Sequence, residues 1–113
     1  LDIDLINWFC EKMEIYTPIV NSSDLGVTGE KVELLVDVCN AIGANRYISP
    51  QGSRSYIDEN NLFESNGIDL VYHEYSHPEY TQLYGSFVPY LSALDILFNE
   101  GPDVLRILRK GRP

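Results

Sequence analysis

Six consecutive residues near the middle of the chain combine groups that can hold an anion. The run Ser49-Pro50-Gln51-Gly52-Ser53-Arg54 follows a strand-like segment and precedes a helical one, which is where open α/β sheets bind ligands beyond the carboxyl ends of their strands. Gly52 would let a ligand approach the backbone, Ser53 offers a hydroxyl, and Arg54 can clamp an anionic oxygen with two N–H groups. We therefore expect these three residues to bind an anionic or nucleotide-sugar-type small molecule. The alternative is an ordinary turn, because Gly-Ser loops are common.

The segment from His77 to Tyr90 is a second candidate, because it is long, rich in aromatic residues and without a predicted helix or strand. Loops of this length are usually functional or disordered, and the aromatic content argues against disorder. His77 could act as a general acid or base near neutral pH, and Tyr80 and Gln82 could orient a polar substrate. The structural alternative is that the aromatic rings plug the end of the sheet while His77 hydrogen-bonds the backbone.

The pattern H-E-x-x-H occurs at His73-Glu74-Tyr75-Ser76-His77. In zinc proteases the two imidazoles lie one helical turn apart, with the glutamate directed at the metal-bound water. Here the preceding Leu70-Val71-Tyr72 is typical of a strand, and Pro78 pushes His77 out of the helical region of backbone conformation. In an extended segment the two histidines would lie about 13 Å apart, at roughly 3.3 Å per residue. We therefore predict no metal site and no cofactor.

The elements that must position these residues alternate between helix and strand, in the order αβαβαβαα. Apolar residues recur at helical spacing in several segments, and Thr28 and Ser92 can cap two of the helices. The predicted strands are residues 14–20, 46–49 and 68–75, and the predicted helices are residues 3–13, the segment from Thr28 to Gly43, residues 58–65, a segment after Ser92 and one from Pro102.

This order of elements predicts an α/β fold with a Rossmann-like three-layer αβα arrangement and a small, mainly parallel sheet. We expect residues 1–113 to form a single domain. Three strands leave two open edges, which indicates that the sheet is part of a larger domain. Ser23 follows the first predicted strand, so we expect it at the same carboxyl edge as Ser53 and Arg54.

Composition limits the class of partner. The chain has 113 residues, 44% of them hydrophobic, and a net charge of −9, so a nucleic-acid partner is disfavoured because phosphates are bound by Lys and Arg. Cys10 and Cys39 each fall in an apolar helical pattern and are expected to be free thiols. No apolar run approaches the ~20 residues that cross a bilayer. We expect a cytoplasmic protein; its oligomeric state is left open.

The densest set of motifs lies between residues 77 and 102. It comprises His77-Pro78-x-Tyr80-x-Gln82, Gly85-x-Phe87-x-Pro89-x-Leu91-Ser92, Asp95-x-Leu97-Phe98-Asn99 and Gly101-Pro102. Weaker motifs precede it, at Ser22-Ser23-Asp24-Leu25, Tyr47-Ile48-Ser49 with Gly52, Tyr56-Ile57-Asp58, and Phe63 with Gly67-Ile68. On these residues the chain from residue 22 onward resembles the C-terminal half of the WbqC-like family, found in bacterial O-antigen and polysaccharide gene clusters.

The resemblance implies a protein that transfers a small group, such as glycine, onto a sugar of the O-antigen. The leading hypothesis is therefore a transferase of surface-polysaccharide biosynthesis. The second is a non-catalytic interaction or assembly module that docks through the open sheet edges and the aromatic segment. A zinc hydrolase is the third and least favoured hypothesis.

Overall fold

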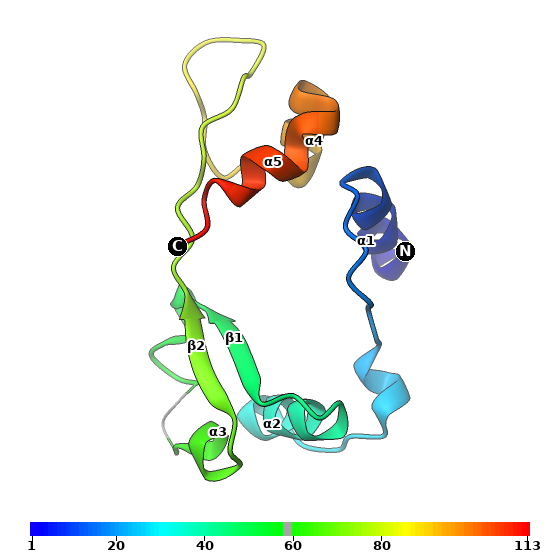
Figure 1. The fold of residues 1–113 in the computed structure, drawn as a ribbon, viewed down its shortest axis with the longest axis vertical. Helices are drawn as coiled ribbons and strands as arrows, with labels where there is room; N and C mark the ends of the chain where they lie inside the picture. Colours follow the sequence, from blue (N-terminus) through cyan, green and yellow to red (C-terminus); the bar gives the residue numbers. More distant parts are fainter. Residues whose placement is uncertain (58–59) are drawn as a thin grey trace. The chain divides into compact units, whose positions relative to one another are not determined.

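Two hydrophobic cores, one in each of two compact units, organise the chain (Figure 1). The computed structural model describes residues 1–57 and 60–113. One unit comprises Ile19–Glu74, and the other comprises Leu1–Pro18 together with Tyr75–Pro113. The N-terminal helix therefore shares its core with the C-terminal helices. That residues 1–113 form one domain stays a prediction.

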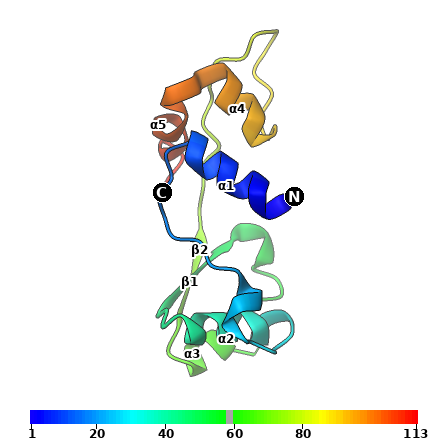
Figure 2. The same ribbon diagram turned by 90° about the vertical axis from the view of Figure 1, so that its right-hand side faces the viewer.

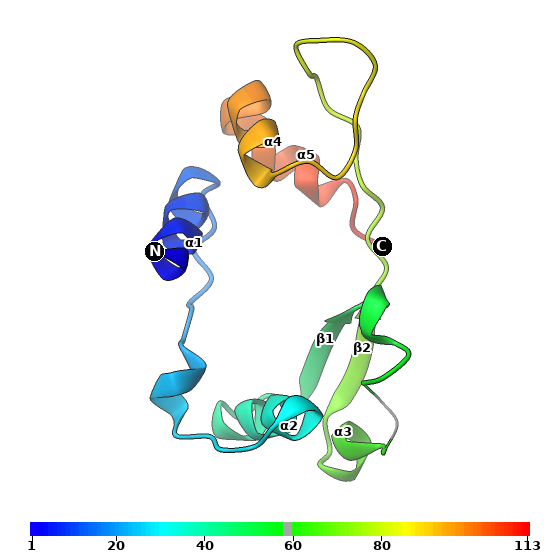
Figure 3. The same ribbon diagram turned by 180° about the vertical axis from the view of Figure 1, so that it is seen from behind.

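The unit of residues 19–74 is built on two parallel strands. Its elements are η1 (Ser22–Leu25), α2 (Lys31–Ala41), β1 (Arg46–Pro50), η2 (Gln51–Ser53), α3 (Leu62–Ser65) and β2 (Asp69–His73). Arg46 pairs with Asp69 and Pro50 pairs with His73, so both strands end at the same edge, as their arrowheads show in Figures 1 and 3. The prediction of a mainly parallel sheet is confirmed for these two strands.

Helices pack on one face of this sheet. Tyr47 and Leu70 are register partners on that face, and the ring of Tyr47 stacks on the fully buried Phe63 with 5.0 Å between centroids. The buried residues of the cluster are Val36, Cys39, Ile57, Phe63 and Ile68. On the opposite face Ile48 and Val71 are exposed. The unit thus has a sheet and one helical layer, and the Rossmann-like three-layer arrangement is not confirmed.

The other unit packs α1 (Asp2–Lys12), α4 (Ala93–Glu100), η3 (Gly101–Asp103) and α5 (Val104–Arg109) around its own core (Figure 2). The buried residues of this core are Met13, Ile96, Leu97, Val104 and Ile107. As predicted, Ser92 caps α4, because its Oγ accepts the N–H of Leu94 at 3.2 Å. The backbone N–H of Ser76 donates to the carbonyl oxygen of Gly111 at 2.9 Å. This bond links the start of the segment between β2 and α4 to the C-terminal residues.

The predicted strand at residues 14–20 is wrong, because the structure assigns no strand to this segment. Tyr16, Ile19 and Val20 are all exposed, so the alternating pattern does not bury one face. Pro18 also removes a donor from any hydrogen-bonded ladder. A strand exists only where a neighbour supplies hydrogen-bond partners, and the sheet in the described residues has two strands rather than three.

The other predicted elements are found with shifted ends. α2 begins at Lys31, later than a cap at Thr28 would place it. Residues 58 and 59, at the start of the helix predicted over 58–65, lie outside the described residues, and α3 covers Leu62–Ser65. Among the described residues, no helix combines the length and apolar character that a bilayer crossing requires.

Candidate functional site

Buried serine hydroxyls hold the loop after β1 in place. Ser53, which is 3% exposed, donates its hydroxyl hydrogen to the carbonyl oxygen of Pro50 at 2.7 Å. The Oγ of Ser53 also lies 2.5 Å from the Oγ of Ser49, which is 1% exposed. Because the Ser53 hydrogen is already donated, Ser49 is the donor of this second bond. The two bonds fasten η2 to the end of β1, so the Ser53 hydroxyl serves the shape of the loop.

Arg54 lies over the ring of Tyr72 at the carboxyl edge of the sheet. The guanidinium carbon is 4.3 Å from the ring centroid, a cation–π contact that also orients the planar group. Tyr72 is the register partner of Ser49, so the parallel pairing brings this ring beside the loop. The N–H groups of a stacked guanidinium lie in its plane and stay available to an anion. Within residues 1–57 and 60–113, Arg54 forms no salt bridge.

Gly52 leaves open space beside the same loop. A Cβ atom added to Gly52 would meet no described atom within 4 Å, and its φ is outside the left-handed region. Neither packing nor backbone conformation therefore requires glycine here. Gln51 ties the loop to the residue after β2, since its Nε2 donates to Oε1 of Glu74 at 3.3 Å. The loop is thus anchored on both strands and open at its glycine.

Ser23 lies on η1, which packs with α2. Figure 1 shows this turn beside α2 rather than at the arrowheads of the strands, where the loop of residues 51–54 begins. The expectation that Ser23 lies at the carboxyl edge depended on a strand over residues 14–20. Because that strand does not form, Ser23 is separated from the loop.

In the other unit, His77 is tied to the backbone through both of its ring nitrogens. Nε2 accepts the N–H of Tyr90 at 3.3 Å, and Nδ1 lies 3.0 Å from the carbonyl oxygen of Pro78. An amide N–H can only donate and a carbonyl oxygen can only accept, so this arrangement places the ring hydrogen on Nδ1. Tyr90 has a φ of 60°, which is uncommon for a residue other than glycine. His77 therefore holds a constrained turn of the backbone.

Aromatic rings pack on His77 within the segment of residues 77–91, here called the aromatic loop. The ring centroid of His77 lies 4.9 Å from that of Tyr90 and 5.9 Å from that of Phe87. The Tyr80 and Phe87 rings meet edge to face at 5.1 Å. Beyond this cluster the tip of the loop reaches solvent, with Tyr84 87% exposed. The aromatic loop is thus ordered at its base and exposes large side chains at its tip.

Tyr80 and Gln82 converge on the carboxylate of Asp95, in the first turn of α4. The Tyr80 hydroxyl donates to Oδ2 at 2.7 Å, and Gln82 Nε2 donates to the same oxygen at 3.1 Å. Asn99 Nδ2 donates to Oδ1 at 3.2 Å. Burial raises the pKa of the Tyr80 phenol, and the hydrogen bond with Asp95 raises it further. Asp95 is therefore the residue around which the predicted pair is organised.

Asp95 lies three positions after Ser92, the spacing of a capping-box partner, which by itself predicts only a role at the end of the helix. The only sequence signal for a role of Asp95 with Tyr80 was that both lie in the motifs between residues 77 and 102, because the two residues are not neighbours along the chain. Gln82 also braces the aromatic loop, since its Oε1 accepts the N–H of Val88 at 2.9 Å and its Nε2 donates to the Val88 carbonyl at 3.0 Å. This pair of bonds closes residues 83–87 into a small loop.

Six of the seven predicted site residues thus fall into two groups, and Ser23 belongs to neither. Gly52, Ser53 and Arg54 lie together in the unit of residues 19–74, whereas His77, Tyr80 and Gln82 lie together in the other unit.

The H-E-x-x-H motif does not form a helix. β2 ends at His73, and the residues from 74 to 80 have no helical turn. The geometry that zinc proteases require, with both imidazoles on one helical face, is therefore missing. Among the residues that the structure describes, no group of three or more His, Cys, Asp or Glu side chains is placed to hold a metal ion.

Comparison with known proteins identifies the family. A sequence profile described as the WbqC-like protein family matches residues 1–107. The chain belongs to the WbqC-like protein family. The match includes the first 21 residues, which carry none of the motifs on which the resemblance was based. No solved structure matches the chain.

One relative in this family is a Mycobacterium tuberculosis protein named uncharacterized protein Rv1507c. It is 37% identical over an alignment of 110 residues, and the alignment covers 94% of this chain and 47% of that protein. The chain therefore spans about half the length of this relative.

Proposed function

We propose that the chain is part of a transferase that moves a small group, such as glycine, during the biosynthesis of a bacterial surface polysaccharide. The family resemblance supports a transferase, and the family profile, which matches residues 1–107, includes the motifs on which this resemblance rests. Within this function, the loop of residues 51–54 binds the anionic part of the ligand, such as the diphosphate of a nucleotide sugar. The observation that carries this assignment is the exposed Arg54 guanidinium held over Tyr72.

The chemistry of the loop supports an anion. Tyr72 orients the planar Arg54 group, so two parallel N–H groups can meet two oxygens of a phosphate with little further ordering. The open side of Gly52 gives such a ligand access to the backbone N–H groups of η2. The Ser49–Ser53 pair keeps this turn in shape before any ligand arrives, which limits the entropy that binding must remove.

The catalytic role expected of His77, Tyr80 and Gln82 stays a prediction. For His77 it requires a substrate to take the place of the Tyr90 N–H at Nε2, because both ring nitrogens are engaged.

Calorimetric titration of nucleoside diphosphates and nucleotide sugars tests the proposal. Arg54→Ala should weaken binding about ten- to a hundredfold, which corresponds to a loss of roughly 1.5–3 kcal/mol for a charge-assisted contact. Arg54→Lys should recover only part of the affinity, since an ammonium group lacks the planar fork. Tyr72→Leu should weaken binding while leaving the charge of Arg54 in place. Gly52→Ala should hinder the approach of the ligand to the backbone, while its Cβ would meet no described atom within 4 Å.

Arg46→Ala is the matched control, because it removes another exposed arginine of the same unit at the opposite end of β1. It removes the same net charge and should leave binding unchanged. If Arg46→Ala and Arg54→Ala weaken binding equally, the effect is general electrostatics and the loop is not the site. If no such ligand binds the wild-type protein, the transferase assignment loses its support.

One observation favours a second candidate, a non-catalytic interaction module. The tip of the aromatic loop exposes Leu83 and Tyr84, and Ile48 and Val71 are exposed on the uncovered face of the sheet. Exposed apolar groups of this kind are typical of protein contacts. Unlike the transferase, this module would retain its partner binding when Arg54 is replaced and lose it when Tyr84 is replaced.

A further inference from the structure

Three residues, Pro89-Tyr90-Leu91, lead from the aromatic loop to the start of α4, and they are here called the strap. Both ends of the strap are fixed by side chains. Before it, the N–H and the carbonyl oxygen of Val88 both bond Gln82. After it, Ser92 caps α4. The position of the strap therefore depends on what holds Tyr90 between these two points.

His77 holds Tyr90 in two ways. The backbone N–H of Tyr90 donates to Nε2 of His77 at 3.3 Å, and the two rings meet edge to face with 4.9 Å between centroids. Burial contributes little, because Tyr90 is 82% exposed. Its φ of 60° costs energy for a residue other than glycine and persists where surrounding contacts enforce it. Loss of the bond to His77 would therefore let the strap relax.

Only the neutral form of His77 can accept this bond. The ring hydrogen lies on Nδ1 and faces the carbonyl oxygen of Pro78, so Nε2 accepts through its lone pair. When a proton from solvent adds to Nε2, both ring nitrogens become donors. The N–H of Tyr90 then faces another N–H and loses its acceptor. Histidine is the side chain whose charge ordinarily changes between pH 5 and 8, so pH in this interval controls the bond.

Of the groups around this ring, His77 alone belongs to the class that titrates in this interval. The rings packed on it are those of Tyr80, Phe87 and Tyr90, and phenols keep their protons below about pH 9. Two carboxylates are close along the chain or through a hydrogen bond. They are the exposed Glu79 and Asp95, which Tyr80 contacts. Carboxyl groups as a class lose most of their charge only below about pH 5.

The strap borders a pocket of about 210 Å³ that His77 also lines. Leu91 of the strap lines this pocket and is 47% exposed, so it forms an outer wall. Where the helices approach the pocket, the side chains that line it carry no charge: Met13 at the end of α1, Ala93 and Ile96 of α4, and Leu108 of α5. Cavities of roughly 150 Å³ already admit benzene. Because Leu91 directly follows Tyr90, movement at Tyr90 shifts this wall.

We propose that the strap is a pH-sensitive gate, in which protonation of His77 frees Tyr90 and opens the pocket at Leu91. The closed form belongs to the alkaline end of the histidine range and the open form to its acidic end. Gln82 and Ser92 keep both ends fixed, so only the strap moves. The gate goes beyond the proposed transferase, because it requires no substrate and one unit provides every residue.

Nitrogen-15 relaxation of the labelled protein tests the gate residue by residue. At pH 8 the amides of Tyr90 and Leu91 should be as ordered as that of Val88, with order parameters of about 0.85. At pH 5.5 the two strap amides should fall below about 0.6, whereas Val88 should not change. Val88 is the matched control, because its N–H donates to Gln82, whose amide does not titrate. The amide signal of Tyr90 should follow the same titration curve as the ring signals of His77.

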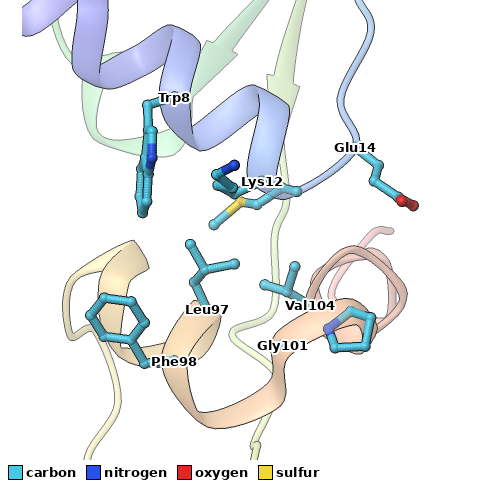
Figure 4. Close-up of a pocket in the computed structure, with 9 residues that line it drawn as sticks. Trp8, Lys12, Glu14, Leu97, Phe98, Gly101 and Val104 are labelled. Carbon is cyan, nitrogen blue, oxygen red and sulfur yellow. The ribbon is translucent and has the colours of Figure 1, made fainter.

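Trp8 shows whether the unit stays folded during this titration. It is the only tryptophan of the chain and packs against the core of this unit. Figure 4 shows its ring at a second pocket, of about 360 Å³, with Leu97 between it and Phe98. Trp8 does not line the pocket beside His77, so its emission should stay constant from pH 8 to pH 5.5. A change in emission that follows the His77 curve would mean unfolding, and it would overturn the gate.

Two substitutions of His77 predict opposite results. His77→Gln retains a neutral acceptor in the side chain, so the strap should stay ordered at both pH values. His77→Lys introduces a permanent donor, so the strap should be mobile at both. His73→Gln is the control, because it removes the only other histidine of the chain, which lies in the other unit. It should leave the response to pH unchanged.

A strap whose order does not change with pH in the wild-type protein would overturn the gate. A response that survives in His77→Gln, or one that disappears in His73→Gln, would do the same. An ordered strap in folded His77→Lys would show that charge at this position does not release Tyr90. If His77→Lys fails to fold, which Trp8 emission reveals, the comparison of the wild-type protein with His77→Gln decides. None of these outcomes bears on the anion site at residues 51–54.

Discussion

The hydrogen bond between Tyr80 and Asp95 is the polar contact whose loss the structure predicts most directly. Tyr80→Phe removes the hydroxyl and keeps the ring, which packs on Phe87 and on the core of its unit. A hydrogen bond to a charged group contributes about 1.5–3 kcal/mol. Asp95 is half-buried, and in the variant it still accepts hydrogen bonds from Gln82 and Asn99. The loss should therefore lie near the lower end of this energy range. We expect the free energy of unfolding to fall by about 1–2 kcal/mol.

A double-mutant cycle separates this contact from the other bonds of Asp95. Asp95→Asn removes the charge and keeps the shape, so it should cost about 1–2 kcal/mol. The double variant should cost less than the sum of the single variants, by about 0.5–1 kcal/mol, because the first change already removes what the second would weaken. Urea denaturation followed by Trp8 fluorescence measures these values, since Trp8 and Tyr80 lie in the same unit.

Tyr84→Phe is the matched control, because Tyr84 is 87% exposed in the same loop. It should change the free energy of unfolding by less than about 0.5 kcal/mol. If Tyr80→Phe has an equally small effect, or if the two single effects simply add, the carboxylate of Asp95 does not organise the aromatic loop.

Three further predictions concern stability. Burial and the contact with Asp95 raise the pKa of the Tyr80 phenol, so the folded state holds this proton more tightly than the unfolded state. Its contribution is present below the unfolded pKa of about 10 and is lost as pH rises through the higher folded value. Urea denaturation between about pH 8 and 11 should therefore show falling stability, with a smaller fall in Tyr80→Phe. Ser92→Ala should lower the free energy of unfolding by about 1 kcal/mol through loss of the helix cap, and an unchanged urea midpoint would contradict this. Gly111→Ala should cost about 1–3 kcal/mol, because its Cβ would lie 2.6 Å from the ring of Tyr75 and clash with the carbonyl oxygen of Ser76; a wild-type thermal midpoint would show that the C-terminus yields easily.

Much of the local structure follows from the sequence because it depends on neighbours along the chain. The apolar spacing of residues 3–13 and the cap at Ser92 each predict a helix that the structure contains. The strands at residues 46–50 and 69–73 also follow from the sequence pattern, with their parallel pairing. Residues 14–20 carry a similar alternating pattern and form no strand, since the pattern supplies side chains for a sheet but no hydrogen-bond partner.

The candidate sites were predicted in part for the same reason. The loop of residues 51–54 was expected from its residue types and its place after a strand. The contact between Arg54 and the ring of Tyr72 could not be predicted, because it depends on the register of β1 with β2. Likewise His77 was noticed as a titratable group, while its bond to the N–H of Tyr90 depends on the path of the loop between them.

The sequence by itself determined the positions of most helices and strands, the family, and a net charge of −9. These follow from composition and from contacts between residues a few positions apart. Only the tertiary structure decided that Tyr80 and Gln82 both donate to one carboxylate oxygen of Asp95. It also decided that Arg54 lies over the ring of Tyr72, and that Trp8 and Phe98 line the same pocket. In each case the partners are 13 to 90 residues apart in sequence, and such pairs meet only through the packing of whole elements, which local pattern does not encode.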